Sequence, residues 1–294
     1  MRLRAVWRSG GMAVGIAALL TAGPRVRLAA QSLDALTLRF SAFTAVSGYE
    51  DAVRDSLLAL LPGATRDRFG NVLVTLGSGA PARLVSCPLD EPGYIVGGIT
   101  PDGYLTLRRA GRDASLLFDQ QFEGQRVTLF GRNGAVPGVV GVRSAHLSRE
   151  RPAVESRFTV DNAYVDVGAT SAAEVASLGL AILTPVALTK APHPYGTGLI
   201  AAPVAARRAA CAALASALLR KPKAHGSVVV AFTVQSLVGG NPGLASVMHA
   251  RGPFADTLTA TLPAKYPDTA AETVSLADAR QLEQRLLAWI EGVK

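Results

Sequence analysis

The chain has 294 residues, which is long enough for one large domain or two modest ones. Of these residues 49% are hydrophobic and 18% are charged, and this composition excludes a disordered protein. Its formal charge of +8 does not indicate a nucleic-acid-binding protein. Five arginines and no acidic residue lie in the first 30 positions, and the remainder carries only +3, without basic residues interleaved with aromatic ones.

The first 30 residues have the pattern of a secretory signal. Arg2, Arg4 and Arg8 precede an uncharged run over residues 10–23, and a small-residue sequence ends at Ala30. A permanent membrane-spanning helix needs about 20 apolar residues, and this run is shorter. We therefore expect a signal peptide over residues 1–30 and a periplasmic or secreted protein. An uncleaved signal that anchors the chain to a membrane is the alternative.

Residues 31–99 are expected to form the first part of an α/β domain. Helical periodicity predicts helix within residues 33–62, and three apolar runs that follow predict strands, the last of them over residues 93–99. The second strand leads into Pro88, Asp90 and Glu91. The carboxyl end of a strand is where α/β proteins place their chemistry, so this stretch is the first candidate for a site.

Residues 100–189 contain short β runs separated by turns, which predicts a small barrel or sandwich inserted into the α/β domain. Within it we expect Asp166 to cap a local turn. Residues 190–294 then predict the second part of the α/β domain, with an apolar strand at 228–234. The predicted fold class is α/β, with a mostly parallel central sheet that has helices on both faces.

The two cysteines, Cys87 and Cys211, are 124 positions apart. One ends a predicted strand and the other lies inside an alanine-rich helix. An exported chain could join them only if the fold brought them together. Because both lie in apolar surroundings, we expect two buried free thiols.

Several stretches follow one another in an order that is specific even though no single stretch is. They are residues 44–50, 67–71, 89–96, 138–141, 165–169, 232–235 and 266–274. Together they resemble the co-catalytic zinc or cobalt aminopeptidases of the glutamyl aminopeptidase, cellulase-M-like and tetrahedral aminopeptidase type. The resemblance implies a zinc-exopeptidase-like domain that holds two metal ions, with an inserted β-domain that helps oligomers to form.

The resemblance also assigns metal-site roles to positions that no longer suit them. A histidine ligand falls at Pro88, the bridging aspartate at Ala206, and the general-base and ligand glutamates at Ser236 and Leu237. A last histidine ligand falls at Asp268, which is a weak ligand by itself. We therefore interpret the chain as a degenerate member of this family and predict no catalytic residue, no metal site and no cofactor, where the family would use two zinc or cobalt ions.

Four candidates remain for a role in the former cleft, which are Asp90, Glu91, Arg208 and Asp268. Asp90 matches an aspartate that steadies the missing histidine, Glu91 follows it, and Arg208 matches a family arginine near the bridging position. The alternative for Asp90 and Glu91 is a structural role, as turn carboxylates that accept backbone N–H bonds. Buried carboxylates need a compensating cation. We expect Arg207 and Arg208 to supply it by pairing with Asp90, Glu91 or Asp268.

Two other chemistries are weaker. A relocated metal site could combine His249 with Asp256 or Asp268, although their spacing is no recognised ligand pattern. Ser236 could be a nucleophile, although no histidine is placed to activate it. None of the histidines falls on a ligand position, and for the first a structural role is expected: His146, His193, His225 and His249.

Two function classes stay open after the sequence is read. The preferred one is a catalytically inactive pseudopeptidase with a peptide-binding, partner-binding or scaffolding role, which forms a homo-oligomer. The alternative is an active metallo-aminopeptidase that releases N-terminal residues from peptides with a non-standard metal site. Whether the chain is an enzyme is therefore undecided at this stage.

Overall fold

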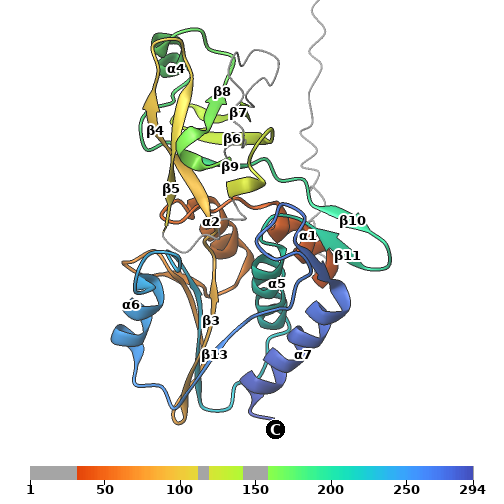
Figure 1. Cartoon of the computed structure of the whole chain (residues 1–294). Helices are drawn as coiled ribbons and strands as arrows, with labels where there is room; N and C mark the ends of the chain where they lie inside the picture. Colours follow the sequence, from red (N-terminus) through yellow and green to blue (C-terminus); the bar gives the residue numbers. More distant parts are fainter. Residues whose placement is uncertain (1–31, 112–118, 142–157, 294) are drawn as a thin grey trace, which may run out of the picture. The chain divides into compact units, whose positions relative to one another are not determined.

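The computed structural model describes residues 32–111, 119–141 and 158–293, which Figure 1 shows in colour. The predicted signal peptide at residues 1–30 and His146 lie outside the described residues. Among the helices described, none is long and apolar enough to cross a membrane.

A five-stranded mixed sheet forms the centre of the α/β domain, in the order β1-β2-β12-β3-β13. Strand β3 is parallel to β12 and β13, whereas β2 is antiparallel to β12 and to β1. Strands β1, β12, β3 and β13 therefore run in one direction, and only β2 departs from the parallel direction expected from the sequence. Residues 78–81 connect β2 to β3, and a parallel crossover needs a dozen or more residues. The strands are β1 (Thr65–Arg66), β2 (Val72–Gly77), β3 (Ala82–Pro88), β12 (Ser227–Thr233) and β13 (Asp256–Thr259).

Helices cover both faces of this sheet, as predicted (Figure 1). Because side chains alternate along a strand, Val228 and Val230 of β12 face one side while Val229 faces the other. Val229 packs in a cluster with Val247 of α6. The first side is covered by α1 (Leu33–Ala42), α2 (Asp51–Leu60), α5 (Ala205–Leu219) and α7 (Leu276–Glu291), and the second by α6 (Pro242–Arg251).

The predicted insertion is a closed barrel in the order β4-β5-β8-β7-β6-β9. Helix α4 (Ala172–Ser177) lies between β8 and β9 along the chain. Its first strand was expected in the α/β domain, but β4 pairs with β5 and β9, so the barrel begins at Gly93 and not at residue 100. A turn over residues 100–104 makes β5 the nearest partner for β4. The strands are β4 (Gly93–Ile99), β5 (Leu105–Ala110), β6 (Arg126–Gly131), β7 (Gly134–Val140), β8 (Tyr164–Asp166) and β9 (Pro185–Leu188).

Two smaller features complete the described chain. Asp166 accepts a hydrogen bond from the backbone N–H of Gly168 at 2.7 Å, so it caps the local turn as predicted. After the barrel, a three-stranded antiparallel sheet leads into α5 and α7. Its strands, in spatial order, are β10 (His193–Tyr195), β11 (Leu199–Ala201) and β14 (Thr273–Ser275).

Candidate functional site

The carboxyl ends of β3 and β12 lie side by side and form the floor of the candidate site. Thr233 pairs with Pro88, and the backbone N–H of Leu89 donates to the carbonyl of Thr233 at 2.7 Å. Charged side chains converge directly above this floor. We call them the strand-end cluster: Asp90, Glu91, Lys190, Arg207 and Arg208.

Asp90 is fully buried, and both of its carboxylate oxygens have protein partners. Its Oδ2 accepts from Ser47 Oγ at 2.6 Å and from the backbone N–H of Leu237 at 2.9 Å. Its Oδ1 accepts from Ser236 Oγ at 2.5 Å and lies 3.4 Å from Arg207 Nη1. The carboxylate therefore has no acceptor site that is not already used by a protein donor.

Glu91 is also buried but is held mainly by cations. Its Oε1 accepts from the backbone N–H of Ala45 at 3.0 Å, and its Oε2 accepts from Arg208 Nη2 at 2.7 Å and from Lys190 Nζ. Burial by itself would raise the pKa of Glu91, but Lys190 and Arg208 outweigh burial and hold that pKa below its ordinary value. Glu91 is therefore ionised at neutral pH.

Lys190 is a member of the cluster that the sequence did not indicate. Its Nζ donates to Glu91 and, at 2.7 Å, to the carbonyl of Phe43. Burial lowers the pKa of Lys190 to about 8, and Arg208 acts in the same direction, against the charge of Glu91. One feature of the sequence could have pointed to it, because Lys190 is the only Lys, Arg, Asp or Glu between Glu174 and Arg207.

The two arginines expected to pair with the carboxylates do so. Arg208 is fully buried, donates from Nη1 to the carbonyl of Leu89, and binds Glu91. Arg207 approaches Asp90 and donates to Ser236 Oγ at 2.7 Å. Both arginines lie in the first turns of α5, which is how one helix supplies two cations to the ends of β3 and β12.

Asp268 is not drawn into the strand-end cluster. It is exposed, and within the described ranges it forms no ion pair with Arg207 or Arg208. Its backbone N–H donates to Glu272 Oε2 at 3.2 Å, and the other oxygen of Glu272 accepts from the backbone N–H of Ala206 at 2.7 Å. A glutamate thus binds the position where the bridging aspartate was expected.

Two buried glutamates were also missed as members of the site. Glu50 accepts from the backbone N–H groups of Gly48 and Gln235, both at 2.9 Å, and Glu272 binds Ala206 as described. Burial raises the pKa of Glu50 and the pKa of Glu272. Both residues lie inside stretches that carry the family resemblance, and this was the signal that could have revealed them.

The side chains present do not fit a centre of two metal ions. Pro88, Ala206 and Leu237 carry no side-chain donor atom, and the oxygens of Asp90 and Glu91 are occupied by protein donors. Across residues 32–111, 119–141 and 158–293, no three His, Cys, Asp or Glu side chains form a group that could hold a metal ion.

This absence also applies to the relocated site considered above. His249, Asp256 and Asp268 do not form such a group in the part of the chain that the structure describes. Ser236 donates its hydroxyl proton to Asp90 and accepts from Arg207, so its oxygen is a link in the cluster. Neither contact resembles the histidine that activates a nucleophilic serine.

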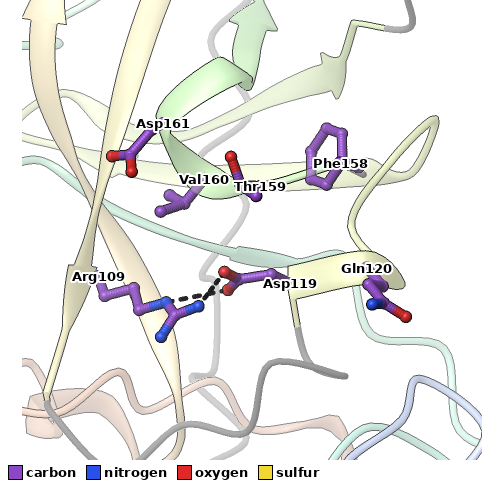
Figure 2. Close-up of a pocket in the computed structure, with 7 residues that line it drawn as sticks. All are labelled: Arg109, Asp119, Gln120, Phe158, Thr159, Val160 and Asp161. Carbon is purple, nitrogen blue, oxygen red and sulfur yellow. Dashed lines mark hydrogen bonds and ion pairs between the residues drawn. The ribbon is translucent and has the colours of Figure 1, made fainter. Parts of the chain in front are cut away.

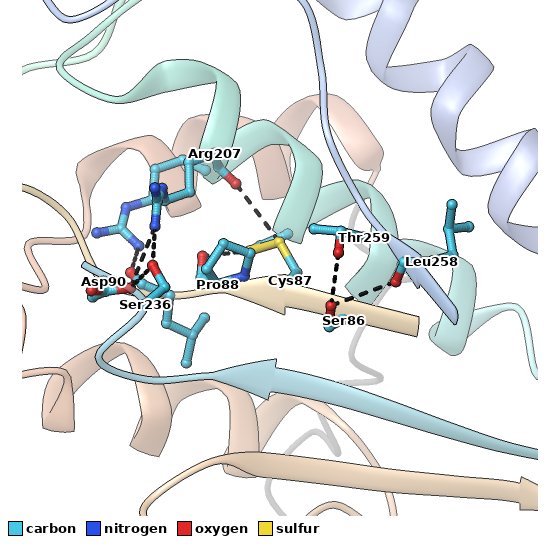
Figure 3. The surroundings of a disulfide bond; sticks show 11 residues. Ser86, Cys87, Pro88, Asp90, Arg207, Ser236, Leu258 and Thr259 are labelled. Atoms are coloured by element: carbon cyan, nitrogen blue, oxygen red, sulfur yellow. Dashed lines mark hydrogen bonds and ion pairs between the residues drawn. A yellow bond between two sulfur atoms is a disulfide. The ribbon is translucent and has the colours of Figure 1, made fainter. Parts of the chain in front are cut away.

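Cys87 and Cys211 form a disulfide, so the expectation of two free thiols was wrong (Figure 3). Their Cα atoms are 5.6 Å apart. Cys87 immediately precedes Pro88 on β3, and Cys211 is one helical turn beyond Arg208 on the face of α5 that covers β3. Figure 3 shows the bond beside Pro88, with Asp90, Arg207 and Ser236 beyond it. The disulfide therefore ties α5 to β3 beside the cluster.

A second candidate is a hollow of about 420 Å³ beside the barrel strands (Figure 2). Arg109 pairs with Asp119, and Tyr94 also donates to Asp119 at 2.7 Å. Asp161 lies 3.5 Å from Arg108. Because its described charged groups neutralise one another, the hollow is a weaker candidate than the strand-end cluster. It is lined by Arg109, Asp119, Gln120, Phe158, Thr159, Val160 and Asp161.

Comparison with protein families identifies the scaffold that carries these features. The model of the M42 glutamyl aminopeptidase family matches residues 70–282. The chain belongs to the M42 family. The family assignment made from the sequence motifs is therefore confirmed.

Two curated aminopeptidase sequences are similar to this chain over part of their length. Lysyl aminopeptidase of Pyrococcus furiosus is 33% identical over 144 residues, which are 47% of this chain and 40% of that protein. Glutamyl aminopeptidase of Lactococcus lactis subsp. cremoris is 32% identical over 145 residues, again 47% and 40%. The chain thus spans less than half the length of these curated relatives.

Solved structures confirm the α/β fold of the M42 chain. An aminopeptidase from Desulfurococcus kamchatkensis superposes with a TM-score of 0.72 at 19% identity, covering 88% of this chain and 94% of the other. The TET1 peptidase of Pyrococcus horikoshii, which can assemble into a tetrahedron or a large octahedral shell, gives 0.73 at 21% identity and covers 88% and 99%.

Proposed function

We propose that this M42-family chain is a pseudopeptidase that binds a peptide or protein partner, or acts as a scaffold, without hydrolysing peptides. One observation carries the proposal: Asp90 and Glu91 are neutralised by the chain's own arginines and lysine. Two-metal hydrolysis needs ions that activate water and a carboxylate that takes its proton. At the position of that general base stands Ser236, which already donates to Asp90.

The test is an assay of the full chain on short peptides with zinc, cobalt or manganese added, together with metal analysis of the purified protein. We expect no release of N-terminal residues and no stoichiometric metal. A peptide ligand would raise the melting temperature without metal, because a ligand that binds only the native state stabilises it. Release of amino acids together with stoichiometric metal would overturn the proposal.

Release of amino acids together with stoichiometric metal would establish the second candidate, an active aminopeptidase with a non-standard metal site. Its support is that similar proteins are named lysyl aminopeptidase and glutamyl aminopeptidase. Against it stands the chemistry of Pro88, Ala206 and Leu237, which leaves a metal with too few ligands. The two candidates differ in one measurement, the release of amino acids at saturating metal.

Self-association is part of the proposal, with a second copy of this chain as the partner. The similar TET1 peptidase assembles into shells, and this chain exposes a patch of apolar side chains where a copy could bind. Tyr49 and Phe130 line one hollow of about 300 Å³, and Tyr49 donates to the carbonyl of Leu183, beside Ile182.

The variant Ile182→Glu tests this patch, since the side chain is 61% exposed and its replacement does not disturb the core. We expect a lower mass by light scattering than for the unchanged chain. Val293→Glu is the matched control, with an exposed fraction of 63% at the end of α7. If both variants keep the mass of the unchanged chain, the patch is not the contact surface.

Export to the periplasm or the cell exterior completes the proposal. It is supported by the signal pattern of residues 1–30 and by a disulfide of the kind that oxidising compartments maintain. Cell fractionation and sequencing of the mature N-terminus would test it, with cleavage expected after Ala30. Recovery of the uncleaved chain in the membrane fraction would favour the anchored alternative.

A further inference from the structure

Four carboxylates are buried in and near the strand-end cluster. Asp90 and Glu91 are adjacent in the chain and 0% and 2% exposed, and Glu50 and Glu272 are also buried. The charge of Asp90 acts on Glu50, and the charge of Arg207 acts on Glu272, so these carboxylates share one electrostatic environment. Such a group of acids needs cations nearby, because a buried charge without a partner is strongly unfavourable.

In this chain the cations come from side chains that also connect the surrounding elements. Arg208 links α5 to the end of β3 through the carbonyl of Leu89 and through Glu91. Arg207 links α5 to the segment after β12 through Ser236. Lys190 links the segment after β9 to the carbonyl of Phe43. A metal ion held by several elements would perform the same two tasks, neutralisation and connection.

We infer that Lys190, Arg207 and Arg208 replace the metal ions of the family as the structural cations of this centre, so that the chain folds and stays folded without divalent metal. The inference rests on the proposed function only for the assignment of the ligand positions. It adds that the centre is a metal-independent junction between β3, β12 and α5. The disulfide between Cys87 and Cys211 ties β3 to α5 covalently beside it.

Arg207 is the most informative of the three cations to remove. Its side chain is 25% exposed, so solvent ions can reach the space it would leave. Without Arg207, the direct partners of Asp90 are the neutral donors Ser47, Ser236 and Leu237. A divalent ion should then be attracted to Asp90, whereas the unchanged chain offers it no vacant oxygen.

The experiment measures thermal unfolding of the full chain in a chelator and in zinc chloride. We expect the unchanged chain to unfold at the same temperature in both. Arg207→Ala should unfold at a lower temperature in chelator and recover by about 2 to 4 °C, in a saturable way, as zinc is added. The control is Arg220→Ala, which removes an exposed arginine at the end of α5 that pairs with Glu283, and which should not respond to zinc.

Two outcomes would overturn the inference. One is a loss of stability of the unchanged chain in chelator that zinc reverses. The other is an Arg207→Ala variant that responds to zinc no more than the unchanged chain does. If Arg207→Ala does not fold, Arg207→Lys keeps the charge and must remain indifferent to chelator. Because unfolding is measured and not hydrolysis, peptidase activity would refute the proposed function without deciding this result.

Discussion

Asp90 and Glu91 are neighbours in the chain and are both buried, yet they are neutralised in different ways. Asp90 is held by two hydroxyl groups and one backbone N–H, and its nearest cation, Arg207, is 3.4 Å away and partly exposed. Glu91 is bound directly by Arg208 and Lys190, both of them buried. Asp90 therefore combines neutral donors with one partly exposed cation, whereas Glu91 depends on fully desolvated ion pairs.

Removal of each negative charge in turn tests this difference between Asp90 and Glu91 most directly. Glu91→Gln leaves two buried cations without their counter-charge, and we expect a loss of about 3 to 5 kcal/mol in the free energy of unfolding. Asp90→Asn removes a charge whose cation can turn to solvent, and we expect about 1 to 3 kcal/mol. Urea unfolding at neutral pH measures both losses.

The exposed Glu123→Gln serves as the control for these two variants, with an expected change within about 0.5 kcal/mol. Equal losses for Glu91→Gln and Asp90→Asn would contradict the distinction between the two carboxylates. A larger loss for Asp90→Asn would mean that its hydrogen bonds, and not the ion pairs of Glu91, hold the ends of β3 and β12 together.

The disulfide beside the cluster gives the next largest effect. Cys87 and Cys211 are separated by 124 residues, and removal of a bond that closes so long a loop costs about 2 to 5 kcal/mol. We therefore expect the double variant Cys87→Ala, Cys211→Ala to unfold at lower urea than the oxidised chain. The urea midpoint is also measured for the unchanged chain in a reducing agent. If neither the reduced chain nor the double variant has a lower midpoint than the oxidised chain, the bond does not constrain α5 and β3.

Part of this organisation was readable from the sequence because it is local. The stretch after β3 identified Asp90 and Glu91, and the expected cations Arg207 and Arg208 lie in one helical turn. The two-sided burial of β12 and the inserted barrel followed from periodicity and turn spacing. Local patterns set the burial of β12 and the barrel, whereas Arg208 was found through its match to the family arginine.

The missed features are contacts between distant segments. Lys190 meets Glu91 across 99 positions, and the disulfide joins residues 124 positions apart, so neither leaves a periodic signal. The direction of β2 was also missed, because the apolar run of a buried strand does not report whether its neighbour is parallel. The place of β4 in the barrel was missed for the same reason. It depends on pairing with β9, which lies about 90 residues later in the chain.

A smaller effect is expected in acid. The pKa of Glu91 lies below its unfolded value of 4.5, so the folded chain holds fewer protons there and the ion pairs stabilise it fully above that pH. This stabilisation is lost as the pH falls from 4.5 through the folded pKa, by about 1.4 kcal/mol for each pKa unit of difference.

Urea unfolding of the unchanged chain and of Glu91→Gln, at neutral pH and in acid, isolates the contribution of Glu91. The remaining buried acids, Glu50 and Glu272, have raised pKa values, so their protonation on acidification favours the folded state. The variant should therefore lose a smaller part of its own neutral-pH stability below pH 4.5 than the unchanged chain does. Parallel urea midpoints for both proteins between neutral pH and acid would contradict an ionised, cation-bound Glu91.

The smallest effect is a shift in the titration of one lysine. Burial lowers the pKa of Lys190 to about 8 against the charge of Glu91, so Lys190 loses its proton as the pH rises through that value. Carbon-13 shifts of the lysine methylene groups next to Nζ should show one midpoint near 8, absent in Lys190→Met. In Glu91→Gln that midpoint should fall further, because the charge that opposes burial is gone. In Arg208→Met it should rise, because a neighbouring positive charge is removed. Opposite shifts in these two variants would establish that Lys190, Glu91 and Arg208 are electrostatically coupled, and shifts of the same sign would show that the lysine responds to general unfolding and not to its two partners.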